Sequence, residues 1–292
     1  MCRLCLLDIA DYAPKLSINR KRKENKNMAL LDPNFQYHLQ ISADKNQVGK
    51  YVILPGDPGR VSKIAEYLDD PKHIATNREY VTYTGSLDGT PVSVVSTGIG
   101  GPSAAIAIEE LVKCGCHTFV RVGTSGGINL KVHGGDLVIA SAAIRGDGAS
   151  AEYLPSCYPA VADFEVVSAL AEAAKQSSTT NAGNAYHVGV VQSKDSFYGE
   201  VAPETMPIAP HLHNRWNAYL KAGCLASEME AATLFSVALV REVRAGAVLT
   251  ALWNVERSKA GLPDSVCKDN SRAIKCAVEA VRKLIVSDRS KS

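Results

Sequence analysis

Short apolar runs alternate with helix-period segments along this chain from about residue 50 onward. β-branched runs bounded by turn residues predict buried strands, and apolar positions three or four residues apart predict helices that cover a sheet. The predicted strands are 51–55, 91–97, 118–123, 136–144, 186–193 and 245–253. The predicted helices are 58–68, 103–114, 163–177, 228–242 and 267–286. This alternation favours one α/β domain, a sheet with helices on its faces.

Two segments lack this alternation. Three prolines between residues 195 and 216 predict a long loop without regular structure, and loops of that length are usually functional. Residues 1–28 contain the basic run 19–26 and predict a mobile N-terminal arm, which leaves 29–292 as the folded domain. A nuclear or nucleic-acid signal in the basic run is the alternative that we do not favour.

Composition and charge narrow the set of partners. The 292 residues carry 32 basic and 30 acidic side chains, a net charge of +2, so no strong field favours nucleic acid or a membrane surface. No apolar run reaches the roughly 20 residues that span a bilayer, and no segment resembles a signal peptide, so a cytoplasmic protein is expected. The eight scattered cysteines predict reduced thiols, and Cys2-x-x-Cys5 lacks a second ligand pair, so no metal is expected.

Three predicted strands run into glycine-rich turns, at 56–60, 98–103 and 123–127. Glycine lets backbone amides approach a ligand, and open α/β sheets bind ligands at the carboxyl ends of their strands. A dinucleotide fingerprint requires G-x-G-x-x-G, but Ser103 stands at its third glycine with Pro102 beside it, and no G-K-[ST] follows any of the turns. The turns therefore favour a single phosphate over a dinucleotide.

Charged residues near these turns supply candidate ligands. Arg60, Arg121 and Thr124 could hold a phosphate by guanidinium forks and a hydroxyl. An arginine in a core strand is costly unless an anion or a carboxylate pairs with it, which singles out Arg121. Glu228 and Glu230 begin a predicted helix, where acids are favourable for the helix dipole alone. A carboxylate of Glu230 that faced inward would instead accept hydrogen bonds from two hydroxyls, such as those of a ribose.

Six motifs in a fixed order resemble the nucleoside phosphorylase family, which includes uridine phosphorylase: GDPGR, STGIGGPS, RVGTSGGI, DGAS, YPAVADFE and SEMEAATL. The resemblance covers about residues 35–285, and DGAS and YPAVADFE resemble the uridine branch. It implies a central mixed β-sheet or distorted barrel flanked by helices, in a homodimer or larger homo-oligomer with shared sites. It further implies reversible phosphorolysis of uridine to uracil and ribose 1-phosphate in pyrimidine salvage, with inorganic phosphate as co-substrate and no cofactor.

The resemblance also implies roles for single residues. Those that resemble phosphate ligands are Gly56, Arg60, Arg121, Thr124 and, lent by the neighbouring subunit, Arg78. Those that resemble ribose contacts are Met229, Glu230, Glu228 beside them and, from across the interface, His38. Gly126 and Phe197 resemble residues that line the base pocket. Catalysis is expected from Arg60, Arg121, Thr124 and Glu230, mainly by positioning and electrostatic stabilisation.

The base-binding loop departs from the family pattern. Uridine phosphorylases usually carry Gln-x-Arg after the Phe-Tyr pair, and Val201 and Pro203 stand at those positions here. Valine cannot hydrogen-bond uracil, and an unpaired polar edge costs about 1–3 kcal/mol. We expect Arg257 to supply a replacement guanidinium. Two alternatives stay open: a divergent phosphorylase with another base preference, and a nucleoside-binding paralogue with little turnover. Trp253-Asn254 weakens a purine-specific reading, because purine enzymes of this family typically carry Ser-Asp there.

Overall fold

The computed structural model describes residues 34–179 and 181–291. The predicted arm at 1–28 lies outside this part of the chain. The strands are β1 (Phe35–Gln36), β2 (Ile41–Ser42), β3 (Tyr51–Pro55), β4 (Asp69–Asn77), β5 (Tyr80–Leu87), β6 (Thr90–Val95), β7 (Thr118–Gly127), β8 (Leu137–Gly146), β9 (Ala160–Val161), β10 (Tyr186–Lys194), β11 (Ala226–Glu228) and β12 (Arg244–Asn254). The α-helices are α1 (Val61–Ala65), α2 (Gly101–Lys113), α3 (Phe164–Ser177), α4 (Phe197–Val201), α5 (Ala209–Lys221), α6 (Ala231–Val240), α7 (Val255–Lys259) and α8 (Ser271–Lys291). Short 3₁₀ helices are η2 (Ala43–Lys45), η3 (Pro58–Arg60), η4 (Ala149–Glu152) and η5 (Pro203–Thr205).

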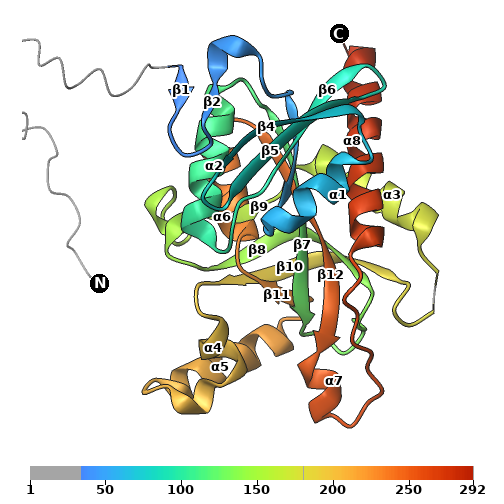
Figure 1. Cartoon of the computed structure of the whole chain (residues 1–292). Helices are drawn as coiled ribbons and strands as arrows, with labels where there is room; N and C mark the ends of the chain where they lie inside the picture. The colour runs from blue at the N-terminus through green and yellow to red at the C-terminus, as the bar shows by residue number, and fades with distance from the viewer. Residues whose placement is uncertain (1–33, 180, 292) are drawn as a thin grey trace, which may run out of the picture. The chain divides into compact units, whose positions relative to one another are not determined.

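A mixed sheet with the strand order β11-β10-β8-β12-β7-β3-β6-β5-β4 forms the centre of the domain (Figure 1). β11 also pairs with β7, in antiparallel orientation, so that β11, β10, β8, β12 and β7 close into a small barrel. β3 joins β7 in parallel and carries β6, β5 and β4 away from the barrel. The predicted fold class, a mixed sheet or distorted barrel flanked by helices, is confirmed.

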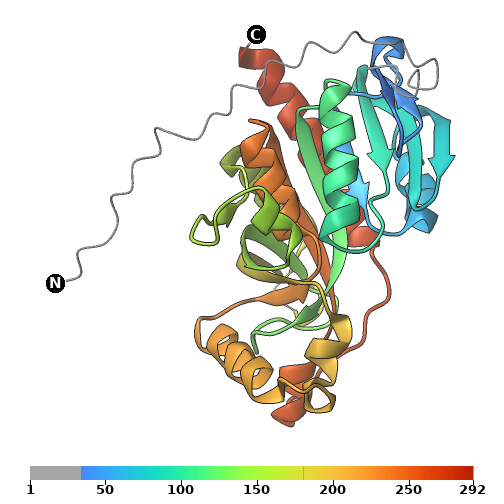
Figure 2. The ribbon, with the colours of Figure 1, turned by 90° about the vertical axis from the view of Figure 1, so that its left-hand side faces the viewer.

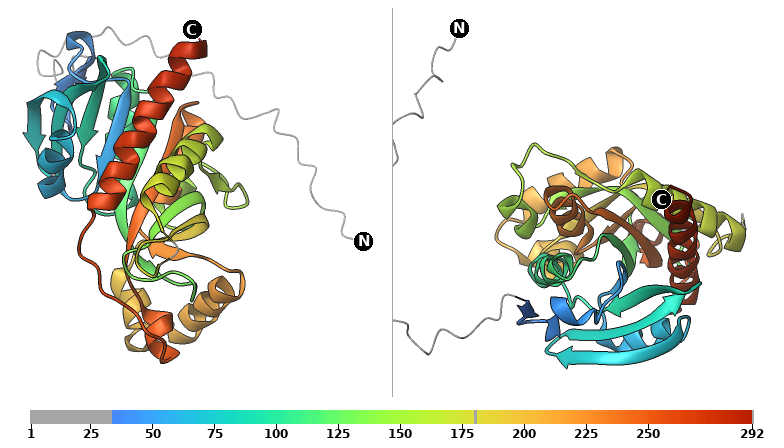
Figure 3. Two further views of the ribbon diagram at one scale, coloured as in Figure 1. Left: turned by 90° about the vertical axis from the view of Figure 1, so that its right-hand side faces the viewer. Right: turned by 90° about the horizontal axis from the view of Figure 1, so that it is seen from above.

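The helices cover the sheet from two sides. Figures 1 and 2 show α2 and α6 side by side, and the left view of Figure 3 shows α8 running beside α3. One core cluster joins residues of α2 and α6 to the sheet, and a second joins residues of α1, α3 and α8 to it. The strands contribute side chains to both core clusters, because successive side chains of a strand point to opposite faces of the sheet. In β7, Phe119 packs in the first cluster, and Val120 and Val122 pack in the second.

All six predicted strands exist; the strand at 51–55 has the predicted bounds, and the other five strands and the five predicted helices have shifted ends. The helix expected at 228–242 begins at Ala231, because residues 226–228 form β11 instead. Gly115 follows the helix expected at 103–114 and has φ of 84°, the left-handed conformation in which glycine commonly ends a helix. None of the helices in the described part of the chain is long and apolar enough to cross a membrane.

The loop predicted at 195–216 is wrong, since this segment contains α4, η5 and the first half of α5. Its prolines do not interrupt these helices: Pro203 begins η5, and Pro210 is the second residue of α5. The first backbone amides of a helix have no partner within it, so proline costs little there. α4, α5 and α7 gather at the end of the barrel where β7 and β12 finish (Figures 1 and 2).

Candidate functional site

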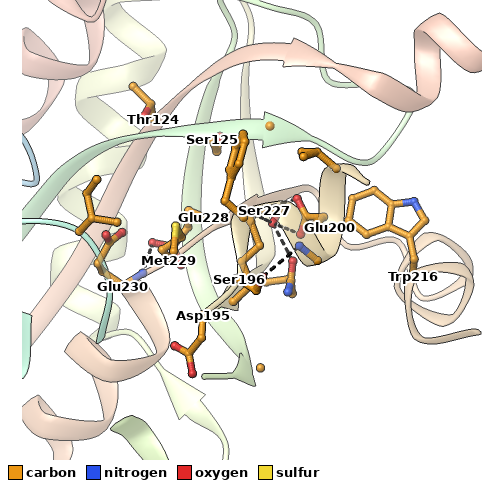
Figure 4. Close-up of a pocket in the computed structure, with 18 of the residues that line it drawn as sticks. Thr124, Ser125, Asp195, Ser196, Glu200, Trp216, Ser227, Glu228, Met229 and Glu230 are labelled. Carbon is orange, nitrogen blue, oxygen red and sulfur yellow. Dashed lines mark hydrogen bonds and ion pairs between the residues drawn. The ribbon is translucent and has the colours of Figure 1, made fainter. Parts of the chain in front are cut away.

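A cavity of 1410 Å³ lies at the carboxyl ends of β3, β7 and β10, bounded by α4, α5 and α7. All three glycine-rich turns contribute to its wall. The predicted site residues that line it are Gly56, Arg60, Arg121, Thr124, Gly126, Phe197, Val201, Glu228, Met229 and Glu230. In Figure 4, Glu230, Met229 and Glu228 lie on one side of the cavity, and Glu200 and Trp216 lie on the other. The sheet therefore brings residues far apart in the sequence into one site.

Arg121 on β7 is buried between two carboxylates. Its Nη2 donates to Glu230 Oε2, and its Nε lies 3.4 Å from Glu228 Oε2. Its Nη1 is buried and has no hydrogen-bond partner among the described residues. A methyl group built on Gly56 would lie 3.9 Å from this nitrogen, so Nη1 faces the first glycine turn. A buried cationic donor without an acceptor fits an anion bound at that turn.

Arg60 adds a second guanidinium at the same end of the cavity. Asp57 caps η3 by accepting from the Gly59 amide at 2.8 Å, and its other oxygen lies 3.5 Å from Arg60 Nε. Burial lowers the pKa of Arg60; Asp57 opposes this shift, and the positive charge of Arg121 adds to it. Two guanidinium groups close enough to repel each other are stabilised by an anion between them. This electrostatic arrangement fits a phosphate held by Arg60, Arg121 and Thr124.

The two acids at the start of α6 do different things. Glu228 caps the helix by accepting from the amides of Glu230 at 2.9 Å and Ala231 at 2.9 and 3.0 Å. Burial raises the pKa of Glu228, Arg121 lowers it, and the nearby charge of Glu230 raises it again. Glu230 turns toward the cavity, where its Oε1 accepts from the Gly100 amide at 2.6 Å. Glu228 therefore holds Arg121 and the helix end, and Glu230 is the carboxylate placed to meet a ligand.

A second polar cluster lines the cavity beside α4, and the sequence analysis missed it. Lys194 at the end of β10 lies 3.0 Å from Glu200 Oε1, with the two side chains only 8% and 16% exposed. Ser227 lies between them and Gln192, and Figure 4 shows it beside Glu200. A lysine directly after the apolar predicted strand 186–193 was the sequence signal that could have drawn attention to this cluster.

Three predicted site residues do not line the cavity. His38 Nδ1 lies 2.7 Å from Glu110 Oε1, and Arg78 is exposed in the turn between β4 and β5, with φ of 54°. Both were expected to act in a neighbouring subunit, and that expectation stays a prediction. Arg257 was expected to reach the base from its own chain, but it is buried in α7. Its Nε donates to Pro263 O at 2.9 Å and its Nη1 to Leu130 O, so this guanidinium holds loops together instead.

The described residues contain no group of three or more His, Cys, Asp or Glu that could hold a metal ion. Six of the cysteines are free thiols, and Cys2 and Cys5 lie outside this part of the chain. Burial raises the pKa of Cys116, Cys224 and Cys276, which keeps these thiols protonated at neutral pH.

The chain is similar to known proteins over the whole region that forms this cavity. A family model described as Phosphorylase superfamily matches residues 50–285, a range that contains every residue lining the cavity. Uridine phosphorylase of Treponema pallidum is 51% identical over 253 residues, 87% of this chain and 95% of that protein. Uridine phosphorylase of Escherichia coli is 40% identical over 85% of this chain and 98% of its own length. Guanosine phosphorylase of Halorubrum lacusprofundi is 39% identical over 85% of this chain and 99% of its own.

Proposed function

The chain belongs to the phosphorylase superfamily, and from this premise we propose that it catalyses the reversible phosphorolysis of uridine to uracil and ribose 1-phosphate. The observation that carries the proposal is the buried Arg121, whose Nη1 faces the Gly56 turn while Nη2 pairs with Glu230. This arrangement places an anion-binding donor next to a carboxylate that can accept from sugar hydroxyls. Relatives named uridine phosphorylase support uridine as the nucleoside.

The geometry supports a mechanism of positioning and charge stabilisation. Arg60, Arg121 and Thr124 hold inorganic phosphate against the Gly56 turn, and Glu230 accepts from the ribose hydroxyls. A phosphate oxygen attacks C1′ while the bond from C1′ to the base nitrogen breaks, and its electron pair leaves with the base. The dianionic phosphate stabilises the oxocarbenium character of the ribosyl group, and no cofactor takes part.

We also propose that the chain forms a homodimer with shared active sites. Arg78 and His38 are surface residues outside the cavity of their own chain, which fits a homodimer in which each subunit completes the site of the other. Arg78 would then contact the phosphate, and His38 the ribose. We also propose a role in pyrimidine salvage in the cytoplasm, because the reaction recovers a base and a phosphorylated sugar from a nucleoside.

Thermal unfolding tests whether the site binds both substrates. We expect inorganic phosphate to raise Tm, and uridine to raise it further in the presence of phosphate, because each ligand binds only the folded state. Inosine, guanosine and cytidine in parallel test the alternative of another base preference. Stabilisation by none of these ligands would contradict the proposed function.

A further inference from the structure

Four side chains form a connected polar cluster in the cavity wall. Lys194 Nζ lies 3.0 Å from Glu200 Oε1 and donates to Ser227 Oγ at 2.6 Å. Ser227 Oγ also lies 2.6 Å from Glu200 Oε2 and 2.7 Å from Gln192 Oε1. All four residues line the cavity.

The cluster lies next to the ribose-facing residues, at the pairing of β10 with β11. β10 and β11 pair in parallel with Gln192 opposite Ser227 and Ser193 opposite Glu228. Ser227 and Glu228 are adjacent in β11, and Ser193 donates to Glu228 and accepts from the Ala232 amide. Along a nucleoside the base follows the sugar, so the cluster lies where a base would follow a ribose bound at Glu230.

The four side chains have hydrogen-bond donors and acceptors that they do not use within the cluster. Ser227 has a single hydroxyl hydrogen for two acceptors, Gln192 Oε1 and Glu200 Oε2. A carboxylate offers about four lone-pair positions, of which Lys194 and Ser227 fill at most two. An ammonium has three N–H groups, of which Glu200 and Ser227 accept two. An acceptor and a cationic donor therefore stand side by side and can serve a ligand.

We propose that Glu200 and Lys194, and not Val201, are the residues that select the base. Glu200 accepts from a ring N–H of the base, and Lys194 donates to the carbonyl oxygen beside that N–H. The pair selects bases with an N–H next to a C=O, as in uracil, hypoxanthine and guanine. This inference rests on the proposed phosphorolysis and names the class of bases on which the site acts.

The hydrogen-bonding groups of uracil determine which of its atoms can face each member of the pair. Its single edge donor, N3–H, lies between the acceptors O2 and O4, so the carboxylate must face N3–H and the ammonium must face an oxygen. Where Lys194 faces the 4-position of the base, cytosine presents the N3 lone pair to Glu200 and its amino group to Lys194, and both contacts are repulsive. Val201 offers no polar side-chain group for either role, and the residue is 49% exposed.

Lys194 also has a part in bond cleavage. When the bond from C1′ to the base nitrogen breaks, the base takes the electron pair and its negative charge spreads onto the carbonyl oxygens. A buried ammonium that donates to one of these oxygens stabilises the charge as it develops. Phe197, whose ring centroid lies 5.9 Å from Lys194 Nζ, bounds the same space.

The test compares uridine with 3-methyluridine, which lacks the N3–H. Wild-type enzyme is expected to prefer uridine by about 100-fold in kcat/KM, and Glu200→Ala to reduce this preference to about 10-fold or less. Glu200→Gln keeps an acceptor oxygen and should retain most of the preference. Lys194→Met should lower kcat on uridine about 10- to 100-fold, and less on 5-fluorouridine, whose base is a better leaving anion.

Lys283→Met is the matched control, because Lys283 forms an ion pair with Glu172 at 3.1 Å between α8 and α3, outside the cavity. It should change none of these ratios. Unchanged ratios in folded Glu200→Ala and Lys194→Met would overturn the inference while leaving phosphorolysis intact, and so would a gain in uracil affinity confined to Val201→Gln. If wild-type enzyme cleaved no nucleoside, the proposed function would fail. Uracil binding by calorimetry would then decide the inference, with about 10-fold weaker binding expected in both variants.

Discussion

At the scale of single residues, the phosphate end of the site depends on the guanidinium of Arg121. Its position in β7 places it among core side chains, where an unpaired charge would be costly. Glu228 and Glu230 compensate that charge, and the same two carboxylates would repel each other without it. Stability and ligand binding are therefore linked through one side chain.

Arg121→Met tests this link. The change leaves two adjacent buried carboxylates without their cation, so we expect a loss of about 3–5 kcal/mol in the free energy of unfolding. Phosphorolysis should fall by about 1,000-fold or more, because the phosphate loses its buried donor. Urea unfolding and kcat/KM measure the two effects. Arg282→Met removes the exposed ion pair with Asp88 and should cost less than about 1 kcal/mol, and an equal cost at both sites would contradict the account.

Gly56→Ala tests the position of the anion. The added methyl group would lie 3.2 Å from Gly98 O and 3.9 Å from Arg121 Nη1, inside the space that faces the guanidinium. We expect KM for phosphate to rise about 10-fold while KM for uridine changes little. Gly126→Ala adds its methyl group in the base pocket, with nothing within 4 Å, and should leave KM for phosphate unchanged. A rise in KM for uridine alone in Gly56→Ala would show that the anion lies elsewhere.

At the level of helices and strands, the sequence predicted the barrel strands β7, β8, β10 and β12 and missed the barrel strand β11 and the edge strand β4. β3, β7 and β12 carry apolar runs because most of their residues are buried on both faces. β4 reads DDPKHIATN and is mostly exposed, so no apolar pattern marked it. Pairing with β5, a contact that local sequence does not encode, makes it a strand.

Only part of the candidate site could be predicted from the sequence. The glycine turns, Arg60, Arg121 and Glu230 belong to motifs that directly follow predicted strands or begin a predicted helix, so their convergence could be inferred. Lys194, Glu200 and Ser227 meet only because β10 and β11 pair and α4 folds over them. Arg257 was misplaced for a similar reason, since one of the two carbonyls that hold it, Leu130 O, comes from a loop far away in the sequence.

The C-terminal helix is held by a charge cluster that makes its docking pH-dependent. Asp288 on α8 accepts from Arg244 Nη1 at 2.9 Å and from Tyr51 at 2.6 Å. The hydrogen bond from Arg244 lowers the pKa of Asp288 below its ordinary value. A lowered pKa in the folded state means that this stabilisation is present above about pH 4 and is lost as the pH falls through the folded-state pKa.

Asp288→Asn should therefore reduce the free energy of unfolding by about 1–2 kcal/mol at pH 7. The difference from wild type should shrink as the pH is lowered below about 4, because the wild-type carboxyl then becomes protonated as well. Chemical denaturation at pH 7, 5 and 3.5 measures this trend. A difference that stayed constant or grew toward acid pH would contradict the assigned ion pair.

At the scale of the whole molecule, the proposed site needs two chains. Arg78 and His38 do not line the cavity of their own chain, and the proposal assigns them to the site of a neighbour. In a dimer with shared sites, one subunit can carry a mutation in a residue that it contributes to its neighbour's site, and the other subunit a mutation in its own site. The fraction of intact sites in such mixed dimers can then be calculated.

Mixed dimers of Arg78→Gln and Glu230→Gln provide that measurement. Each variant alone should be nearly inactive, since every site lacks one residue. Subunit exchange at equal amounts makes about half of the dimers mixed, and each mixed dimer has one intact site of two, so about a quarter of wild-type activity should return. Failure to recover any activity after verified exchange would show that Arg78 acts in its own chain or not at all.

Phosphorolysis of uridine can be measured by following uridine absorbance with and without inorganic phosphate, and by identifying the sugar product. The account predicts cleavage only with phosphate, with uracil and ribose 1-phosphate formed in equal amounts, and the reverse reaction from these two products. Cleavage at the same rate without phosphate, or no cleavage of uridine by protein that binds phosphate, would contradict it.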